Sequence, residues 1–217
     1  MLKDNRKQIV DYIMKKHGFY NYEVKCISEC PIESRRKKGG SWCDYHENGT
    51  TIIYLRENET DDLEDIIVAA HEASHAINYR DSKINIKELK KKSIFRNIFM
   101  VLGLVVPTCS LGVLFFAREM LILNTLIFLC FLTMISSTYF IFNYYTLHKQ
   151  DEINAETLSN QELNIMYKNN TKKMNDIKKR INKRIKEVSV ADFIGFVVYD
   201  AFIIVANTAI IWLSLIL

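Results

Sequence analysis

Three long uncharged stretches constrain the fold of this chain more than any other feature of its sequence. They are residues 97–117, 121–145 and 193–217, and a single acid, Asp200, interrupts them. Each is long enough to cross a bilayer as a helix, and core helices of soluble proteins rarely run for more than about 18 residues without a charge. We therefore expect three transmembrane helices, the first two of which form a hairpin.

Basic residues flank these stretches asymmetrically. Lys and Arg are frequent in 83–96 and 149–186, whereas the turn within the hairpin holds only Arg118 and Glu119. The positive-inside rule then predicts a multi-pass cell-membrane protein with a cytoplasmic N-terminal part and its C-terminus outside. The charged first residues lack the apolar region of a signal peptide. No basic motif with interleaved aromatic residues indicates nucleic-acid binding, so the net charge of +4 is mainly a topology signal.

The remaining segments indicate a small α+β domain on one side of the membrane. Helices are expected over 2–17 and 61–80, and strands over 22–27 and 50–55, with a loop or wide hairpin between the strands. We divide the chain into a cytoplasmic part, a two-span hairpin, a second cytoplasmic helical segment and a final span, which are residues 1–96, 97–145, 146–190 and 191–217.

The sequence HEASH lies within the helix expected over residues 61–80, which Asp61 can cap. On a helix, His71 and His75 project from one face, so their imidazoles can bind one zinc ion. Glu72 would then stand beside the metal-bound water. This HExxH pattern is typical of zinc hydrolases, most often metallopeptidases.

A catalytic zinc site needs a third protein ligand, and the hairpin predicts where it lies. Because the two spans leave and re-enter on the same side, the sequence HKQDEINAE that follows them should return to the HEASH helix. Glu152 could bind the metal, with His148 as a competing ligand. Glu156 could hydrogen-bond a ligating histidine and fix its tautomer. Alternatively, these are solvated charges on a helix that leaves the membrane.

The order of these motifs resembles a known family. A mixed segment, VAAHEASHAI, a two-span hairpin, DEINAE and a final apolar segment are together similar to the YugP-like membrane zinc metallopeptidases of bacteria. The resemblance covers nearly the whole chain and implies a zincin-like domain with zinc as cofactor. Ser74 departs from the family's usual Gly, and Glu156 stands where a small residue is common. The roles implied are metal ligand for His71, His75 and Glu152, and general base for Glu72.

Two weaker patterns concern further polar groups of the cytoplasmic part. An oxyanion needs a hydrogen-bond donor, and the sequence does not choose among its candidates, which are Tyr45, His46, Tyr79 and His148. A loosely spaced set could bind a second, structural zinc, or could be free thiols and a loop histidine. This set is Cys26, Cys30, Cys43 and His46.

Further expectations concern the membrane. An acid such as Asp200 inside a span is costly unless paired or wetted, so it is a candidate functional residue. The basic stretches 84–95 and 177–188 could lie on anionic lipid, although 177–188 could equally pack on the cytoplasmic domain. The strand over 50–55 could present an edge to an extended peptide.

Together these patterns predict a membrane-embedded zinc metallopeptidase that hydrolyses peptide bonds near the cytoplasmic membrane face. Its expected partners are the lipid bilayer and a peptide or membrane-protein substrate. Two alternatives stay open. One is a tethered peptidase similar to the ImmA/IrrE family, which cleaves a soluble regulator and needs no ligand after a membrane hairpin. The other is a catalytically inactive membrane pseudo-peptidase.

Overall fold

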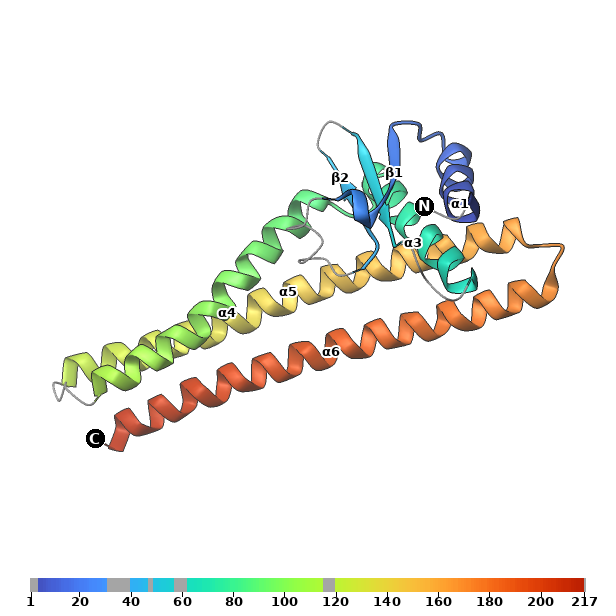
Figure 1. The fold of residues 1–217 in the computed structure, drawn as a ribbon. Helices are drawn as coiled ribbons and strands as arrows, with labels where there is room; N and C mark the ends of the chain where they lie inside the picture. Colours follow the sequence, from blue (N-terminus) through green and yellow to red (C-terminus); the bar gives the residue numbers. More distant parts are fainter. Residues whose placement is uncertain (1–3, 31–39, 47–48, 57–61, 115–119, 217) are drawn as a thin grey trace. The chain divides into compact units, whose positions relative to one another are not determined.

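The computed structural model describes residues 4–30, 40–46, 49–56, 62–114 and 120–216. These residues are mostly helical, with one small three-stranded sheet (Figure 1). The expected mixture of helices and a small sheet is confirmed, although helix predominates more than an α+β class implies. The elements are α1 (Asp4–Lys16), β1 (Tyr22–Cys26), the short 3-10 helix η1 (Ile27–Glu29), β2 (Trp42–Tyr45), β3 (Thr51–Leu55), α3 (Asp62–Arg80), α4 (Ile86–Leu114), α5 (Met120–Met166) and α6 (Thr171–Ile216).

The chain divides into two compact units, each made from two separate segments. The first, here called the sheet unit, comprises Met1–Asn85 and Gln150–Val188. The second, the three-helix unit, comprises Ile86–Lys149 and Ser189–Leu217. The helices α5 and α6 each contribute residues to both units, because each runs without interruption through the boundary.

The sheet unit is built around strands in the order β1-β3-β2, with β1 parallel and β2 antiparallel to β3. The strands expected over 22–27 and 50–55 are confirmed to within one residue. They pair in parallel, and the long connection that a parallel pair requires contains a further strand, β2. Since β3 is hydrogen-bonded on both sides, the expectation that residues 50–55 offer a free edge to a substrate is wrong.

The core of the sheet unit lies between α1, the sheet, α3 and the nearby parts of α5 and α6. One face of α1 enters it through side chains four residues apart, such as Ile9 and Ile13, which are 4% and 0% exposed. The central face of α3 carries alanines, which let neighbouring elements approach closely. The helix expected over 61–80 is thus confirmed as α3, while its proposed cap, Asp61, lies outside the described residues.

The apolar stripe within residues 177–188 belongs to this core. Ile177 and Ile181 are both 0% exposed, and Ile185 packs against the same cluster. The interpretation of this stripe as a lipid-binding face is therefore wrong, and packing on the domain is confirmed. A basic helix with a narrow apolar stripe can bury that stripe in lipid or against a protein core. Here the neighbouring core decides which face is buried.

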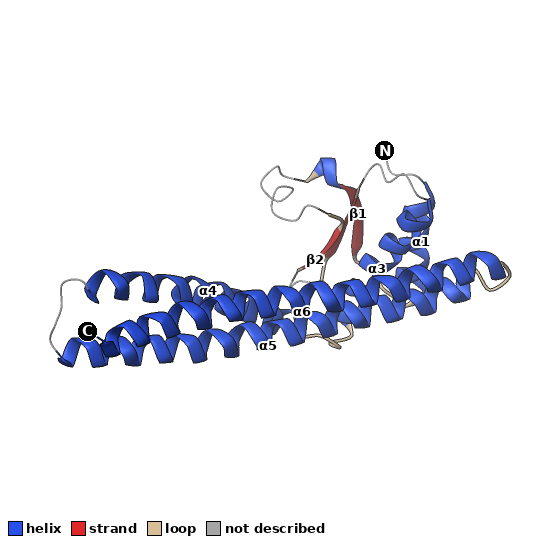
Figure 2. Ribbon diagram, turned by 90° about the horizontal axis from the view of Figure 1, so that it is seen from below, coloured by secondary structure: helices blue, strands red, loops and turns tan. Residues whose placement is uncertain are grey.

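The helices of the three-helix unit, α4, α5 and α6, are each long and apolar enough to cross a membrane (Figure 2). The helices extend beyond the uncharged stretches, since α4 begins at Ile86 and α6 at Thr171. From Ile86 on, the basic 84–95 segment is therefore the first part of α4, and its contact with anionic lipid stays a prediction. Lys, Glu and Ile at these junctions are compatible with helix, and no Gly or Pro interrupts them. Arg118 and Glu119 lie outside the described residues.

Small and polar side chains set the packing inside the three-helix unit. A Cβ added to Gly103 would lie 3.0 Å from Ser137 Oγ and 3.1 Å from Ile203 Cδ1, so these two side chains would have to shift by a few tenths of an ångström to admit one. The fully buried Asn207 donates to the Ile203 carbonyl (2.8 Å) and accepts from Thr133 Oγ1 (3.3 Å). Paired polar groups of this kind are tolerated between membrane helices.

Candidate metal centre

The helix α3 holds both motif histidines one turn apart and buries them. His71 and His75 are 5% and 6% exposed, and their Nε2 atoms are 3.1 Å apart. Ser74, between them, donates its hydroxyl to the Ala70 carbonyl (2.7 Å), so this buried polar group is satisfied within the helix. Ser74 is thus accommodated in the buried face of α3 without an unpaired hydroxyl.

Glu152 approaches the two histidines from α5. Its Oε2 lies 3.3 Å from His71 Nε2, and its Oε1 lies 3.6 Å from His75 Nε2. One ligand atom from each of the three residues can be chosen so that all lie within 4.8 Å of one another. A tetrahedral zinc ion with bonds of about 2.1 Å holds its ligand atoms about 3.4 Å apart. The histidine nitrogens fit that spacing, and Glu152 fits it toward each histidine through a different oxygen.

A second carboxylate stands behind each histidine. Asp151 Oδ1 lies 3.2 Å from His75 Nδ1, and Glu156 Oε1 lies 3.2 Å from His71 Nδ1. The first contact is a hydrogen bond, whereas the second is an ion-pair contact without hydrogen-bond alignment. Both Nδ1 atoms face carboxylates, so both Nε2 atoms point toward Glu152. This is the arrangement by which proteins orient metal-binding histidines.

Tyr79 completes the support on the His75 side. Its hydroxyl donates to Asp151 Oδ2 (2.6 Å), and its ring stacks on His75 with centroids 5.6 Å apart. Burial and the neighbouring Asp151 raise the pKa of Tyr79, which keeps it a neutral donor. Tyr79 was a candidate oxyanion donor from the sequence, but its proton is directed to Asp151 here.

Arg184 of α6 supports the His71 side. It donates through Nε to Glu156 Oε1 (2.9 Å) and through Nη1 to Glu64 Oε1 (2.8 Å), so it joins α3, α5 and α6. Burial acts to raise the pKa of Glu156, but His71 and Arg184 outweigh it and hold that pKa below its ordinary value. Glu156, only 1% exposed, is therefore a buried carboxylate with its charge balanced.

Acidic groups dominate the electrostatics between the two rings. Burial opposes the charged form of His71, yet Glu152 and Glu156 raise its pKa to about 10. Burial acts against His75 in the same way, and Asp151 outweighs it and raises that pKa too. The site thus favours positive charge at its centre, which either protons or a metal cation can supply.

Glu72 is buried at 7% exposure beside the two histidines. Burial raises its pKa above the ordinary value for a glutamate, although both histidines act to lower it. The residue also lines a cavity of about 290 Å³, together with Ser41, Arg56 and Val68. Glu72 is therefore in contact with a space that a small group can enter.

The other candidates from the sequence lie in different places. Tyr45, on β2, packs edge-on against Tyr79 with ring centroids 6.1 Å apart. His46 is exposed, and its backbone closes the turn to Thr50. His148 belongs to the three-helix unit and is not part of the group whose ligand atoms converge.

Asp200 lies on the part of α6 that belongs to the three-helix unit. Thr138 Oγ1 donates a hydrogen bond to its Oδ1 (2.5 Å). The acid is thus paired with a hydroxyl of a neighbouring helix, which lowers the cost of placing it in a span.

The proposed second zinc site does not form among the residues that the structure describes. Cys30 packs with Trp42 and Tyr54, whereas Cys43 packs against the main core on the other face of the sheet. No metal-binding group includes these cysteines or His46. The structure favours the alternative of free thiols and a loop histidine, because neighbouring positions on a strand point to opposite faces.

Sequence reasoning missed two residues of the centre, Asp151 and Arg184. Asp151 precedes Glu152, so on a helix it points about 100° away from the Glu152 side chain. It reaches the cluster because the two imidazoles present their Nδ1 atoms on different sides. The adjacent acids in DEINAE were the available signal. No sequence signal distinguishes Arg184 from the many basic residues around it.

Comparison with models of known protein families, with curated proteins and with solved structures finds no match to this chain.

Proposed function

We propose that the protein is a zinc-dependent peptidase in which His71, His75 and Glu152 hold the metal. One observation carries this proposal: three ligand side chains converge, and each histidine is oriented from behind by its own carboxylate. An incidental ion-pair network between α3 and α5 does not require a separate carboxylate at the Nδ1 atom of each histidine. A zincin-like domain, as the HEASH helix implies, is part of the proposal.

Glu72 has the position and the environment of a general base. A bound zinc would polarise the scissile carbonyl and lower the pKa of water at the site. Glu72 would take a proton from that water and transfer it to the leaving amine. Burial, which raises its pKa, brings the carboxyl closer to the range in which it can both accept and donate a proton near neutrality.

Asp151 and Glu156 are proposed to position the ligands and not to react. Each keeps one imidazole in the orientation that directs Nε2 to the metal. Arg184 and Tyr79 in turn fix these two carboxylates. Both histidines, Asp151 and Glu156 are buried, so packing sets their geometry before a substrate arrives.

The proposed setting is the cytoplasmic face of the membrane. Glu152 follows the last residue of the first three-helix segment, Lys149, by three positions. The chain therefore ties the centre to the membrane-length helices. Tethering raises the effective concentration of substrates held on the same surface, so we propose membrane proteins or membrane-proximal segments as substrates.

Replacement of Glu72 by Gln tests the chemistry. The Glu72→Gln protein should bind zinc as the wild type does and lose peptidase activity by about 10²–10⁴-fold, because an amide cannot accept the proton. Glu187→Gln, at an exposed position of α6, is the matched control and should keep full activity. An active Glu72→Gln enzyme would show that Glu72 is not the base.

A further inference from the structure

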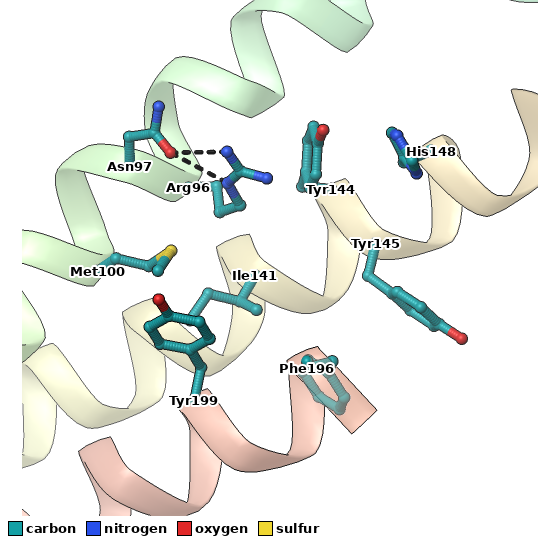
Figure 3. A pocket seen from close by; sticks show the side chains of 10 residues that line it. Arg96, Asn97, Met100, Ile141, Tyr144, Tyr145, His148, Phe196 and Tyr199 are labelled. Atoms are coloured by element: carbon teal, nitrogen blue, oxygen red, sulfur yellow. Dashed lines mark hydrogen bonds between the residues drawn. The ribbon is translucent and has the colours of Figure 1, made fainter. Parts of the chain in front are cut away.

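A pocket lies within the three-helix unit, and no residue of the metal centre lines it. It has a volume of about 390 Å³ and is lined by residues of α4, α5 and α6 (Figure 3). That volume is within the range of small-molecule binding sites. The metal chemistry proposed above makes no use of this pocket.

One part of the pocket is cationic and rich in hydrogen-bond donors. The Arg96 guanidinium lies 4.0 Å from the centre of the Tyr144 ring, and its Nε and Nη2 donate to Asn97 Oδ1 at 3.1 and 2.8 Å. The Asn97 oxygen takes one proton from Nε and one from Nη2, so Nη1 keeps two protons and Nη2 keeps one to donate. No Asp or Glu is among the lining residues, and within the described chain Arg96 has no carboxylate partner. The positive charge is held in place but not neutralised.

Another part of the pocket is apolar. Figure 3 shows Tyr199 beside Met100 and Ile141, with Phe196 further along α6. Gly195 also lines the pocket, and a Cβ added there would meet nothing within 4 Å. The pocket therefore joins a guanidinium to an apolar surface with open space above a glycine.

The position of the lining residues along the chain indicates the depth of the pocket. Arg96 and Asn97 mark the junction between a basic flank and the first uncharged stretch. Tyr145 ends the second uncharged stretch, and Phe196 lies near the start of the third. In a membrane these junctions fall at the level of the lipid headgroups, where Tyr and Arg are typical.

We propose that this pocket binds an anionic phospholipid, with the headgroup phosphate on Arg96 and the first part of an acyl chain along the apolar side. Arg pairs with phosphate through two parallel N–H donors. Basic pockets between membrane helices on the cytoplasmic side recognise anionic headgroups. A free phosphate would use the same guanidinium but would gain nothing from the apolar part.

The first test removes the charge. The full-length protein would be titrated with phosphatidylglycerol in detergent micelles and its bound lipid counted by native mass spectrometry, with phosphatidylcholine as the uncharged comparison. Arg96→Gln should weaken phosphatidylglycerol binding about tenfold or more, the loss expected for a charged hydrogen bond. Lys91→Gln removes one charge from the same helix outside this pocket and should leave binding within about twofold. Equal losses would overturn the proposal in favour of general surface attraction.

The second test fills the pocket without touching its charge. Gly195→Leu places a side chain in the open space and should abolish the bound lipid while the protein stays folded. Gly112→Leu is the matched control, since a Cβ at this helical glycine also meets nothing within 4 Å and Gly112 does not line the pocket. Retained lipid in Gly195→Leu would overturn the proposal. Full displacement of the lipid by millimolar inorganic phosphate would also overturn it, because the apolar part would then contribute nothing.

Discussion

At the scale of single residues, the candidate metal centre is supported by two carboxylates outside the converging group of three, Asp151 and Glu156. Asp151 accepts hydrogen bonds from two sides, from His75 Nδ1 and from the Tyr79 hydroxyl. Its oxygens therefore hold the His75 ring at a fixed angle. Glu156 has the same role toward His71, with Arg184 in the place of Tyr79.

Asp151→Asn should lower the zinc affinity by about 10- to 100-fold, the usual cost of losing a partner that orients a metal ligand. The amide keeps the size of the side chain but lacks the charge that strengthens the histidine as a ligand. Competition with a chromophoric chelator would measure the affinity. Asp176→Asn, at an exposed position of α6, is the control and should match the wild type. Equal affinities for all three proteins would mean that Asp151 does not support the metal.

The convergence of His71, His75 and Glu152 could be predicted from spacing, whereas the side chains behind the two histidines could not. His71 and His75 follow from the four-residue repeat of a helix, and Glu152 follows from the return of the hairpin. Asp151 points away from Glu152 on the same helix, so its role appears only when the two rings are placed. The position of a long-range partner such as Arg184 depends on which face of a basic helix packs against the core.

At the scale of elements, α6 is bound to the sheet unit by two fully buried isoleucines, Ile177 and Ile181. This contact brings Arg184, one turn beyond Ile181, to the back of the metal centre. The stripe is therefore part of the scaffold of the site.

Ile181→Ala should destabilise the sheet unit by about 2–5 kcal/mol, the typical cost of truncating a buried isoleucine. Thermal unfolding of the protein in detergent would record this as a lower midpoint. Ile194→Ala, where the side chain is 54% exposed, should shift the midpoint far less. If Ile181→Ala instead left the midpoint unchanged and released the protein from anionic vesicles, the stripe would be a lipid contact.

Some of the helices and strands could be predicted from the sequence and others could not, for a physical reason. The helices α1 and α3 and two strands could be located from periodicity and β-branched composition. The strand β2 could not, because Trp42–Tyr45 is short and its hydrogen bonds come from β3, which lies beyond it in the sequence. Parallel pairing of β1 with β3 is likewise a non-local property.

At the scale of the whole molecule, two units are interleaved along one chain. The three candidate metal ligands of the sheet unit come from segments on either side of the hairpin, Met1–Asn85 and Gln150–Val188. The membrane-length helices could be predicted from uncharged length alone. Their continuation into the sheet unit could not, because helix propensity does not change at the membrane boundary.

The charge asymmetry predicts the orientation of the molecule. In a background without reactive native cysteines, Lys38→Cys should be protected from an impermeant thiol reagent in intact cells, because the positive-inside rule predicts that the Lys/Arg-rich flanks stay in the cytoplasm. A cysteine added after Leu217 should be labelled. The reverse pattern would invert the topology and place the metal centre outside.

Metal analysis of the purified full-length protein tests the central claim most directly. The wild type should carry about one zinc per chain, as expected for a catalytic site with three protein ligands. His75→Ala should carry little, because it removes a ligand from the group formed with His71 and Glu152. Equal zinc in the wild type and in His75→Ala would contradict the assignment of this centre.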